Sequence, residues 1–552
     1  MTALSYVSGP STAPLIGRTI GAELDRVARE TPEALAVVSC HQGVRLSYGE
    51  LHETVERAAR AFLSLGVAKG DRVGIWAGNC VEWLIVQYAT AKVGAVLVNV
   101  NPAYRRHELE YALGKSAVTV LVAARSFRQT DYLEMLRAVT PELPSLRATV
   151  LLGEPSAGML GWEEFLEGGG PALAAKLRDR ESELDFDDPI NIQYTSGTTG
   201  FPKGATLSHH NILNNGFFVG EGCGYTAADR ICVPVPLYHC FGMVMGNLGA
   251  LTHGAAVVYP DVAFDAKATL EAIEAERCTS LYGVPTMFIA ELQDPDFARF
   301  DLSSLRTGIM AGSPCPVEVM KETIDRMHLR DVTICYGMTE TSPVSFQSGK
   351  TDDLEHRTAT VGAVHPHVEC KIIDSETGRA VPRGTPGELL SRGYLVMLGY
   401  WGDELATSAA IDPAGWMHTG DLAVMRDDGY VNIIGRIKDM VIRGGENIFP
   451  REIEEFLYRH PKVQDVQVVG VPDQKYGEEL CAWVKLKDGH TATEEEIKAF
   501  CKGQIATFKI PRYIRFSEAF PMTVTGKIRK VEMREVSVRE LGLELAASIE
   551  TA

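Results

Sequence analysis

The sequence predicts an α/β protein with a large N-terminal domain of parallel sheets, a small β subdomain and a smaller α+β domain at the C-terminus. Up to about residue 345, helical patterns alternate with short apolar runs, as they do in layered α/β architectures. After about residue 360, strand-like runs are separated by turns such as Thr377-Gly378 and Asp428-Gly429. A final stretch of about 110 residues, within normal domain size, again mixes helix and strand patterns.

The N-terminal part contains one clear helical pattern and several buried strand patterns. Tyr48 to Leu65 has apolar residues at helical spacing. The apolar stretch from Trp83 to Val100 is interrupted by Gln87, Lys92 and Asn99, so it predicts a buried helix followed by a strand, not a membrane span. Further strands are expected at 72–76, 95–99, 118–122, 255–259, 279–282 and 307–311.

The C-terminal part begins with antiparallel strand patterns, from Val368 to Asp374 and from Gly387 to Arg392. Charges on both sides of Ile437 then mark a change of pattern. Beyond it, helices are expected at 452–460 and 494–504, and strands at 463–471 and 480–487. We therefore divide the chain into residues 1–435, a connection at 436–440 and residues 441–552.

Composition limits the classes of partner. The 552 residues are 45% hydrophobic with a formal net charge of −18, so large cores are expected and nucleic acid or an anionic membrane is not an expected partner. Met1 to Asp25 has no secretory signal pattern, and the last three residues are no organelle address. Eleven dispersed cysteines favour reduced thiols in the cytoplasm over disulfides or a zinc site.

A loop rich in hydroxyls and glycines lies between strand patterns at 190–194 and 205–209. Glycines let backbone N–H groups approach an anion closely, hydroxyls donate hydrogen bonds, and Lys203 adds a mobile positive charge. A polyphosphate needs these groups, which belong to Thr195, Ser196, Gly197, Thr198, Thr199, Gly200 and Lys203. A flexible Ser/Gly linker is the alternative, and the flanking strands disfavour it. The spacing also differs from the common nucleotide-triphosphatase loop.

Two other segments carry groups that suit a nucleotide. A strand pattern ends at Tyr336-Gly337, where an aromatic ring can stack on a base, and Glu340 follows with an oxygen of the kind that Mg²⁺ prefers. Asp421 can accept both ribose hydroxyls, and Arg436 can donate to ribose or phosphate oxygens. Each segment alone is explained as well by an ordinary turn.

The last segment is Thr525-Gly526-Lys527, in which the glycine predicts a turn that presents the lysine. A lone exposed lysine is usually just solvated surface. Together, however, the loop at 195–203, Tyr336 to Glu340, Thr419 to Asp421, Gly435 to Asp439 and this segment resemble the adenylate-forming superfamily in order and spacing. That superfamily includes acyl-CoA synthetases, and the resemblance extends from about residue 20 to 535.

The resemblance implies that a carboxylate attacks the α-phosphorus of Mg·ATP to give an acyl-adenylate and pyrophosphate. Coenzyme A then displaces AMP to give a thioester. Nucleotidyl transfer depends mainly on positioning and charge neutralisation. The implied catalytic residues are Lys527, Thr339, Glu340 and His239, with Mg²⁺ held by Glu340 and indirectly by Thr198. The implied ATP and AMP site comprises Thr195, Ser196, Gly197, Thr198, Thr199, Gly200, Lys203, Gly312, Ser313, Tyr336, Asp421 and Arg436.

The resemblance also implies a moving C-terminal domain. Lys527 must approach the site for the first step and leave it for the second. Lys438 stands at the position of the superfamily's hinge. A hinge residue has to absorb a large φ/ψ change. After the rotation, Gly444 and Gly445 are expected to line the tunnel for coenzyme A.

The acid is expected to be a fatty acid of medium length, bound by an acyl pocket of His239, Phe241, Gly242 and Gly337. Amino-acid-activating relatives carry an acidic residue in this region that pairs with the substrate ammonium, and no such residue lies near His239 here. An ordinary core histidine is the alternative interpretation of His239. An aryl-CoA ligase, a carrier-protein-loading enzyme and an inactive binding homologue are the other classes considered. A protein acetyltransferase acting on Lys527 is a candidate partner, and a homodimer is left open.

Overall fold

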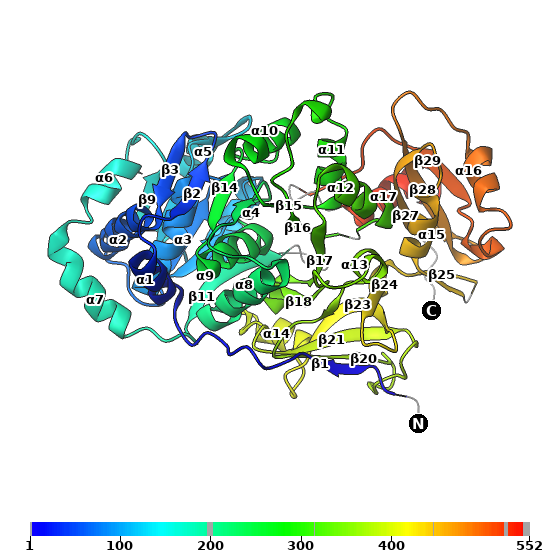
Figure 1. The fold of residues 1–552 in the computed structure, drawn as a ribbon, viewed down its shortest axis with the longest axis horizontal. Helices are drawn as coiled ribbons and strands as arrows, with labels where there is room; N and C mark the ends of the chain where they lie inside the picture. Colours follow the sequence, from blue (N-terminus) through cyan, green and yellow to red (C-terminus); the bar gives the residue numbers. More distant parts are fainter. Residues whose placement is uncertain (1–2, 196–201, 314, 445, 524–527, 545–552) are drawn as a thin grey trace.

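The computed structural model of the protein describes residues 3–195, 202–313, 315–444, 446–523 and 528–544. Their strands form four large sheets and the short hairpin of β7 (Ser126–Phe127) and β8 (Thr130–Asp131). Helices cover the sheets, as Figure 1 shows. The predicted fold class is confirmed, because two sheets are mainly parallel and their strands alternate with helices along the chain.

The first sheet has eight strands, and the predicted phosphate loop connects two of them in sequence. Its first six strands run parallel, and the last two are antiparallel to their neighbours. In spatial order the strands are β10 (Leu160–Gly161), β9 (Ala148–Leu151), β6 (Val120–Ala123), β4 (Arg72–Trp76), β5 (Val96–Asn99), β11 (Pro189–Thr195), β12 (Lys203–Ser208) and β22 (Gly399–Tyr400).

The second sheet has nine strands, with a parallel centre and antiparallel edges. Its central strands are buried apolar runs, as expected when helices cover both faces of a parallel sheet. In spatial order the nine strands are β19 (Ala363–Val364), β18 (Val344–Gln347), β17 (Asp331–Gly337), β16 (Thr307–Ala311), β15 (Ser280–Gly283), β13 (Arg230–Cys232), β14 (Ala256–Tyr259), β2 (Leu35–Ser39) and β3 (Val44–Ser47).

The helices begin and end at sites that the sequence marks locally. For example, Ser47 and Glu50 form a reciprocal capping box at the start of α2, and Gly224 ends α8 in the left-handed conformation. In chain order the helices of this part are α1 (Ile20–Glu30), α2 (Tyr48–Ser64), α3 (Val81–Val93), α4 (Arg106–Lys115), α5 (Tyr132–Val139), α6 (Trp162–Glu167), α7 (Ala174–Ser182), α8 (His209–Cys223), α9 (Gly249–His253), α10 (Ala266–Glu276), α11 (Pro285–Leu292), α12 (Val317–Arg326), α13 (Leu354–Ala359) and α14 (Glu404–Ala410).

The stretch from Trp83 to Val100 is a buried helix followed by a strand, as predicted. Helix α3 is buried on nearly every side and packs against α1, α2 and α7. Its Lys92 is fully buried and lies 2.6 Å from both Asp25 and Glu181, which explains a charged residue in an apolar run. None of the helices that the structure describes is long and apolar enough to cross a membrane.

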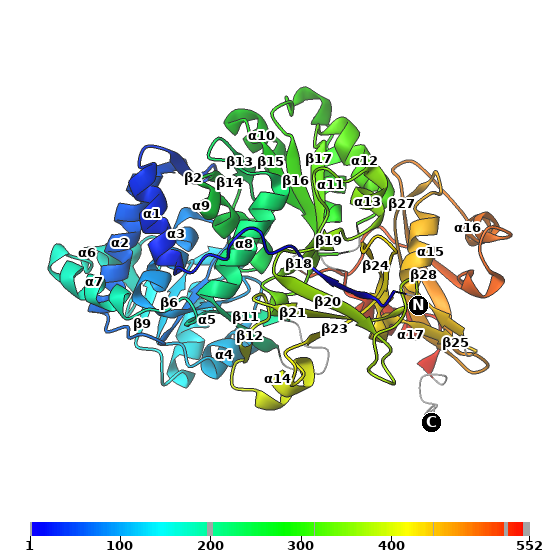
Figure 2. The ribbon, with the colours of Figure 1, turned by 60° about the horizontal axis from the view of Figure 1, so that its bottom comes forward.

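The third sheet is antiparallel and includes a strand from the N-terminus. Its order is β1 (Tyr6–Ser8), β20 (Val368–Ile373), β21 (Gly387–Gly393), β23 (Met417–Met425) and β24 (Val431–Arg436). Figure 2 shows the dark blue N-terminal segment running along this sheet. The predicted antiparallel strands are confirmed, whereas β1 was not expected, because its partner lies more than 350 residues away in sequence.

The fourth sheet consists only of residues after 440 and lies with its helices at one end of the molecule (Figure 1). It contains β26 (Glu446–Ile448), β25 (Val441–Arg443), β28 (Gly477–Leu486), β27 (Val463–Asp473) and β29 (Tyr513–Phe516). The helices are α15 (Pro450–Leu457), α16 (Glu494–Cys501) and α17 (Lys530–Glu540). A separate apolar core from residues 441–514 supports the predicted α+β character of this part.

Candidate active site

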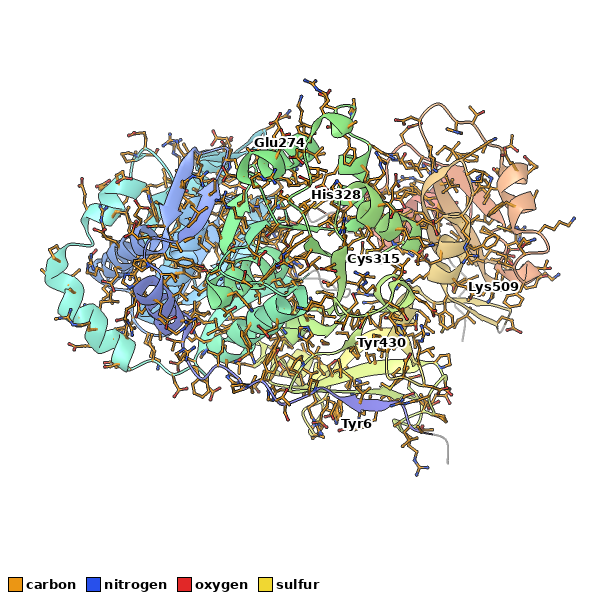
Figure 3. All side chains as sticks on the ribbon, in the orientation of Figure 1. Tyr6, Glu274, Cys315, His328, Tyr430 and Lys509 are labelled. Atoms are coloured by element: carbon orange, nitrogen blue, oxygen red, sulfur yellow. The ribbon has the colours of Figure 1, made fainter. Side chains whose placement is uncertain are left out.

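A cavity of about 980 Å³ lies where the second and third sheets meet the C-terminal part. Its lining starts at the carboxyl ends of β16 and β17, where open α/β sheets commonly bind ligands. Residues of the third sheet, α11, α15 and α17 complete the lining. Cys315, labelled in Figure 3, belongs to this wall. The cavity thus joins parts of the chain that are far apart in sequence.

The nucleotide-type residues predicted from separate motifs meet in this cavity. Tyr336 of β17 donates its hydroxyl to Asp421 Oδ2 at 2.6 Å, and Arg436 Nε lies 3.1 Å from Asp421 Oδ1. Asp421 and Arg436 are directly opposed on β23 and β24. Burial raises the pKa of the Asp421 carboxyl, and the Arg436 charge opposes that rise. The result is a buried carboxylate held by two donors.

The turn after β16 and the end of β17 supply close backbone approaches. Gly312 has φ +89°, which favours glycine, and it lines the cavity together with Ser313. Gly337 also lines the cavity, and a Cβ there would lie 1.8 Å from Pro343 O, so no side chain fits. The backbone conformation at Gly312 and the close contact at Gly337 therefore explain why glycine stands at both positions beside the predicted adenine site.

The short helical turn η5 (Thr339–Thr341) follows β17 and holds two predicted catalytic residues. Thr339 lines the cavity and lies 3.8 Å from Cys240 Sγ. Glu340 is 6% exposed and accepts a 2.8 Å hydrogen bond from Tyr400 at Oε1. Lys203 Nζ lies 5.1 Å from the centre of the same Tyr400 ring. The sequence reading missed Tyr400, since a tyrosine next to a glycine carries no local sign of this contact.

The predicted acyl pocket lies on a π-helix, η3 (Phe241–Leu248), a rare form that often occurs at functional sites. His239, Phe241 and Met245 line the cavity, and His239 Nδ1 accepts from the Phe241 backbone N–H at 3.1 Å. Gly242 is not in this lining. A Cβ on Gly242 would lie 2.5 Å from Pro236 O, so close backbone packing requires a glycine at this position.

Behind Phe241 lies a buried polar layer. Phe241 stacks on Tyr282 with ring centres 5.5 Å apart, and Tyr282 donates to Met245 O at 3.1 Å. Tyr225, at the end of α8, lies 3.0 Å from the Tyr282 hydroxyl and 2.6 Å from Ser280 Oγ. Because these hydroxyls are satisfied within the layer, it forms a rigid support under the π-helix.

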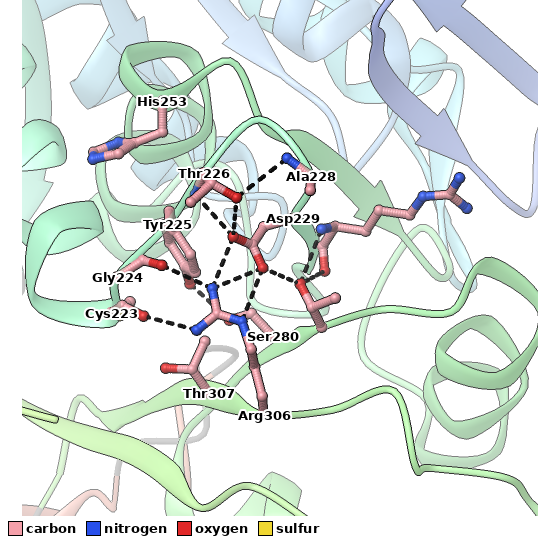
Figure 4. Close-up of polar contacts among 12 residues, drawn as sticks. Cys223, Gly224, Tyr225, Thr226, Ala228, Asp229, His253, Ser280, Arg306 and Thr307 are labelled. Carbon is pink, nitrogen blue, oxygen red and sulfur yellow. Dashed lines mark hydrogen bonds and ion pairs between the residues drawn. The ribbon is translucent and has the colours of Figure 1, made fainter.

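An ion pair, Asp229 with Arg306, anchors the end of α8 beside this layer (Figure 4). Two Arg306 nitrogens lie 2.8–3.1 Å from the Asp229 carboxylate, and Thr279 donates to it at 2.7 Å. Arg306 also donates to Gly224 O at 2.8 Å, which caps the helix C-terminus. Burial by itself would raise the pKa of the Asp229 carboxyl, but these contacts outweigh it and the pKa is lowered.

Several predicted residues lie outside the described ranges: Ser196, Gly197, Thr198, Thr199, Gly200, Gly445 and Lys527. Their neighbours are described. Thr195 pairs with Lys203 across β11 and β12, so the loop closes a hairpin. Thr523 and Ile528, on either side of the segment with Lys527, both line the cavity. Gly444 lies on the turn between β25 and β26 and is not part of the cavity lining.

The connection to the C-terminal part reaches the site directly. Lys438 lines the cavity within the helical turn η6 (Ile437–Asp439). Burial and the nearby Arg436 charge lower the pKa of the Lys438 ammonium. Beyond it, Arg451 of α15 donates to Ile433 O at 3.0 Å, so the two parts touch at the cavity rim.

Among the described residues, one group has metal-ligand geometry, formed by Asp25, His52 and Glu56. The Lys92 ammonium lies 2.6 Å from Asp25 and 3.5 Å from Glu56. A positive charge therefore already neutralises this group. None of the eleven cysteines forms a disulfide, and ten of them are buried.

Comparison with known proteins places the chain in a family. The model of the AMP-binding enzyme family matches residues 24–401, and the model of the AMP-binding enzyme C-terminal domain matches residues 452–527. A putative acyl-CoA synthetase, YngI, of Bacillus subtilis is 49% identical over 96% of this chain and 99% of its own. The mitochondrial medium-chain acyl-CoA ligase ACSF2 of Danio rerio is 46% identical over 98% and 91%.

Solved structures share the fold over nearly the full length. The anthranilate CoA ligase AuaEII in complex with anthranoyl-AMP has a TM-score of 0.85 at 27% identity, covering 97% of this chain and 99% of its own. ATP-bound MatB from Rhodopseudomonas palustris has a TM-score of 0.80 at 30% identity, covering 94% and 99%. The chain therefore belongs to the AMP-binding enzyme family, the adenylate-forming superfamily that its motifs resemble, and is an ATP-dependent acid–thiol ligase of the acyl-CoA synthetase type.

Proposed function

We propose that this enzyme activates a medium-chain fatty acid. The carboxylate attacks the α-phosphorus of ATP, pyrophosphate leaves, and the thiol of coenzyme A then attacks the acyl carbonyl and expels AMP. The observation that carries the proposal is the continuity of the cavity. It joins the Tyr336–Asp421–Arg436 group to the apolar side chains around Phe241 and to the segment flanking Lys527.

The nucleotide end of the cavity fits ATP. Gly312, Ser313 and the Tyr336 ring would bind adenine, while Asp421 and Arg436 would bind ribose. Thr339 would lie near the α-phosphate. The hydroxyl and glycine loop, from Thr195 to Lys203 with Ser196, Gly197, Thr198, Thr199 and Gly200 between them, would hold the leaving pyrophosphate.

Mg²⁺ would be held by Glu340, with an indirect contribution from Thr198. The donor set suits this ion, because Glu340 offers a hard carboxylate oxygen close to Thr339. The bound ion would neutralise phosphate charge during the displacement. The protein's own contributions are orientation and positive charge: Lys203 at the leaving phosphates, and Lys527 between the attacking carboxylate and the α-phosphate.

The acyl end of the cavity favours an aliphatic tail. His239, Phe241, Met245 and Ile289 line it, and flexible or branched apolar side chains suit a narrow hydrocarbon. Gly337 also lines the cavity, and its backbone would approach the carboxylate end. Relatives at 44–46% identity named as medium-chain acyl-CoA ligases support the chain length. An aryl acid remains the second candidate, favoured by the likeness to the anthranilate CoA ligase structure. A carrier protein as the thiol acceptor is a further alternative.

We further propose that residues 1–435 and 441–552 act as two domains joined by a hinge at 436–440. Lys438 would absorb the rotation between the two steps. The hairpin turn with Gly444 and Gly445 would then approach the cavity and line the path of coenzyme A. The separate core of residues 441–514 supports this division.

Two partner proposals and a location accompany this function. Acetylation of Lys527 by a protein acetyltransferase would remove the charge needed for the first step.

A homodimer is proposed for testing by analytical ultracentrifugation. A reducing compartment such as the cytoplasm is proposed from the eleven dispersed cysteines, none of which forms a disulfide, and several relatives are named as mitochondrial.

Pyrophosphate release tests the proposal across saturated fatty acids from acetate to octadecanoate and across benzoate and cinnamate, with and without coenzyme A. The expected optimum lies at medium-length acids, with acyl-CoA as the product. Release that is greatest with an aryl acid, or a reaction that ignores coenzyme A, would overturn the assignment of acid or acceptor.

A further inference from the structure

We infer that Tyr400 is a positioning residue for the adenylation step, holding Glu340 and Lys203 in separate, fixed places around the metal-bound polyphosphate. The inference rests on the proposed function and assigns a role to a residue that lies outside the recognised motifs. It starts from two contacts of one side chain. The Tyr400 hydroxyl donates to Glu340 Oε1 at 2.8 Å, and its ring lies 5.1 Å from Lys203 Nζ.

The backbone fixes Tyr400 between the two residues. Strand β22 pairs with β12, the strand that begins at Lys203, with Tyr400 opposite Ala205. The backbone N–H of Trp401 donates to Gly204 O at 2.8 Å. The Tyr400 backbone N–H donates to Thr407 Oγ1 at 2.9 Å, which ties β22 to α14. A short edge strand thus carries the phenol to a set position beside the phosphate loop.

The same segment is also tied to Glu340. The backbone N–H of Met397 donates to Glu340 O at 3.0 Å. Glu340 is therefore held twice by residues 397–400, once through its backbone and once through its carboxylate. With the pairing of β22 to β12, this segment couples the predicted metal ligand to the base of the phosphate loop.

Electrostatics explains why a phenol suits this position. Glu340 and Lys203 carry opposite charges and both approach the same aromatic ring, so direct pairing would neutralise the groups that the metal and the phosphates require. The ring attracts the ammonium through its electron-rich face, while the hydroxyl binds the carboxylate.

The hydrogen bond also orients the Glu340 carboxylate, because Oε1 accepts from Tyr400. Because the Glu340 carboxylate is already oriented, its side chain would lose less conformational entropy when the metal binds. Loss of the hydroxyl should therefore weaken metal binding in the nucleotide complex, and loss of the ring should in addition weaken the hold on the phosphates.

Two variants separate these effects. Tyr400→Phe removes the donor and keeps the ring, whereas Tyr400→Leu removes both. Tyr430→Phe is the matched control, because Tyr430 also donates to a carboxylate, Asp352 Oδ1, at 2.7 Å, and Asp352 has no proposed role at the site. Figure 3 labels Tyr430. Melting temperatures of all three variants establish that the fold is retained.

The first readout is Mn²⁺ affinity, measured by electron paramagnetic resonance in the presence of a non-hydrolysable ATP analogue. We expect Tyr400→Phe to weaken it by about 10-fold, since hydrogen bonds to charged groups contribute in this range. Combining Tyr400→Phe with Glu340→Gln should add no further loss, because the hydroxyl acts through that carboxylate. Additive losses in the double variant, or unchanged affinity in Tyr400→Phe, would overturn the inference.

The second readout is acid-dependent exchange of pyrophosphate into ATP. In Tyr400→Phe the Mg²⁺ concentration for half-maximal exchange should rise while the KM for ATP changes little. In Tyr400→Leu both should rise, and Tyr430→Phe should match the wild type. Equal KM values for ATP in the Phe and Leu variants would refute the role of the ring. A wild-type enzyme without acid-dependent exchange would instead count against the proposed function, which keeps the two failures distinct.

Discussion

The Tyr336 hydroxyl donates to Asp421 Oδ2 at 2.6 Å, and this contact joins the second sheet to the third at the cavity. The other Asp421 oxygen is bound by Arg436 at 3.1 Å. A carboxylate oxygen can accept more than one hydrogen bond, so Asp421 can keep these donors and still receive ribose hydroxyls. The two contacts therefore orient Asp421 before the nucleotide arrives.

Replacing the carboxylate should weaken ATP binding more than removing its orienting donor. We expect Asp421→Asn to raise the KM for ATP by about 10-fold or more, since hydrogen bonds to charged groups contribute ~1.5–3 kcal/mol. Tyr336→Phe keeps the ring for the base and should cost less. Steady-state exchange kinetics measure both. A larger effect in Tyr336→Phe would show that Asp421 does not bind the ribose.

Lys527→Ala should impair acyl-adenylate formation by about 100-fold or more, as does the loss of other donors at a developing charge. Thioester formation from added acyl-adenylate should change little, because the lysine is expected to have left the site. Single-turnover assays of each half-reaction measure this, with the exposed Lys502→Ala as the control. Equal losses in both half-reactions would disprove the role.

Lys438→Pro should retain adenylation and lose thioester formation. Lys438 lies in a short 3-10 turn, whose φ is compatible with proline, and proline would prevent the rotation into other conformations. Lys438→Ala removes the ammonium but keeps backbone freedom, so it should support both steps. Wild-type thioester rates in the proline variant would refute the hinge.

Phe241→Ala should shift the acid preference toward longer chains. Phe241 is 5% exposed and stacks on Tyr282, so its truncation opens space between the π-helix and the buried polar layer. The measurement is kcat/KM for a series of fatty acids. Phe218→Leu, at another buried aromatic outside the cavity lining, is the control. An unchanged optimum would show that Phe241 does not limit the pocket.

His356 should make stability depend on pH. Its Nε2 lies 2.9 Å from Asp428 and its Nδ1 2.8 Å from Asp353, and these contacts raise the pKa of the imidazole above 6.5. A raised folded pKa gives stabilisation that is complete below the unfolded value and is lost as pH rises through the folded value.

The melting temperature of wild type minus that of His356→Gln should therefore be largest below about pH 6 and shrink toward higher pH. The exposed His490→Gln is the control, for which no such trend is expected. A difference that grows with rising pH would contradict the sign of the linkage.

Local patterns were sufficient for most of the elements. Helical spacing predicted α2, and apolar runs predicted β4, β5 and β16, because periodicity and burial act over a few residues. The π-helix at Phe241–Leu248 was not predicted, since its residues do not distinguish it from an α-helix. The close approach of Gly242 to Pro236 O was also not predicted, since it depends on how the chain folds back at this point.

The sequence by itself determined the fold class, the order of the motifs and the kinds of group available to bind a nucleotide. Only the tertiary structure decided which of these groups meet. Tyr336 and Asp421 are 85 residues apart, and Glu340 and Tyr400 are 60 apart. Such pairs are set by the packing of whole sheets, as in the pairing of β22 with β12, and no local preference of either residue encodes them.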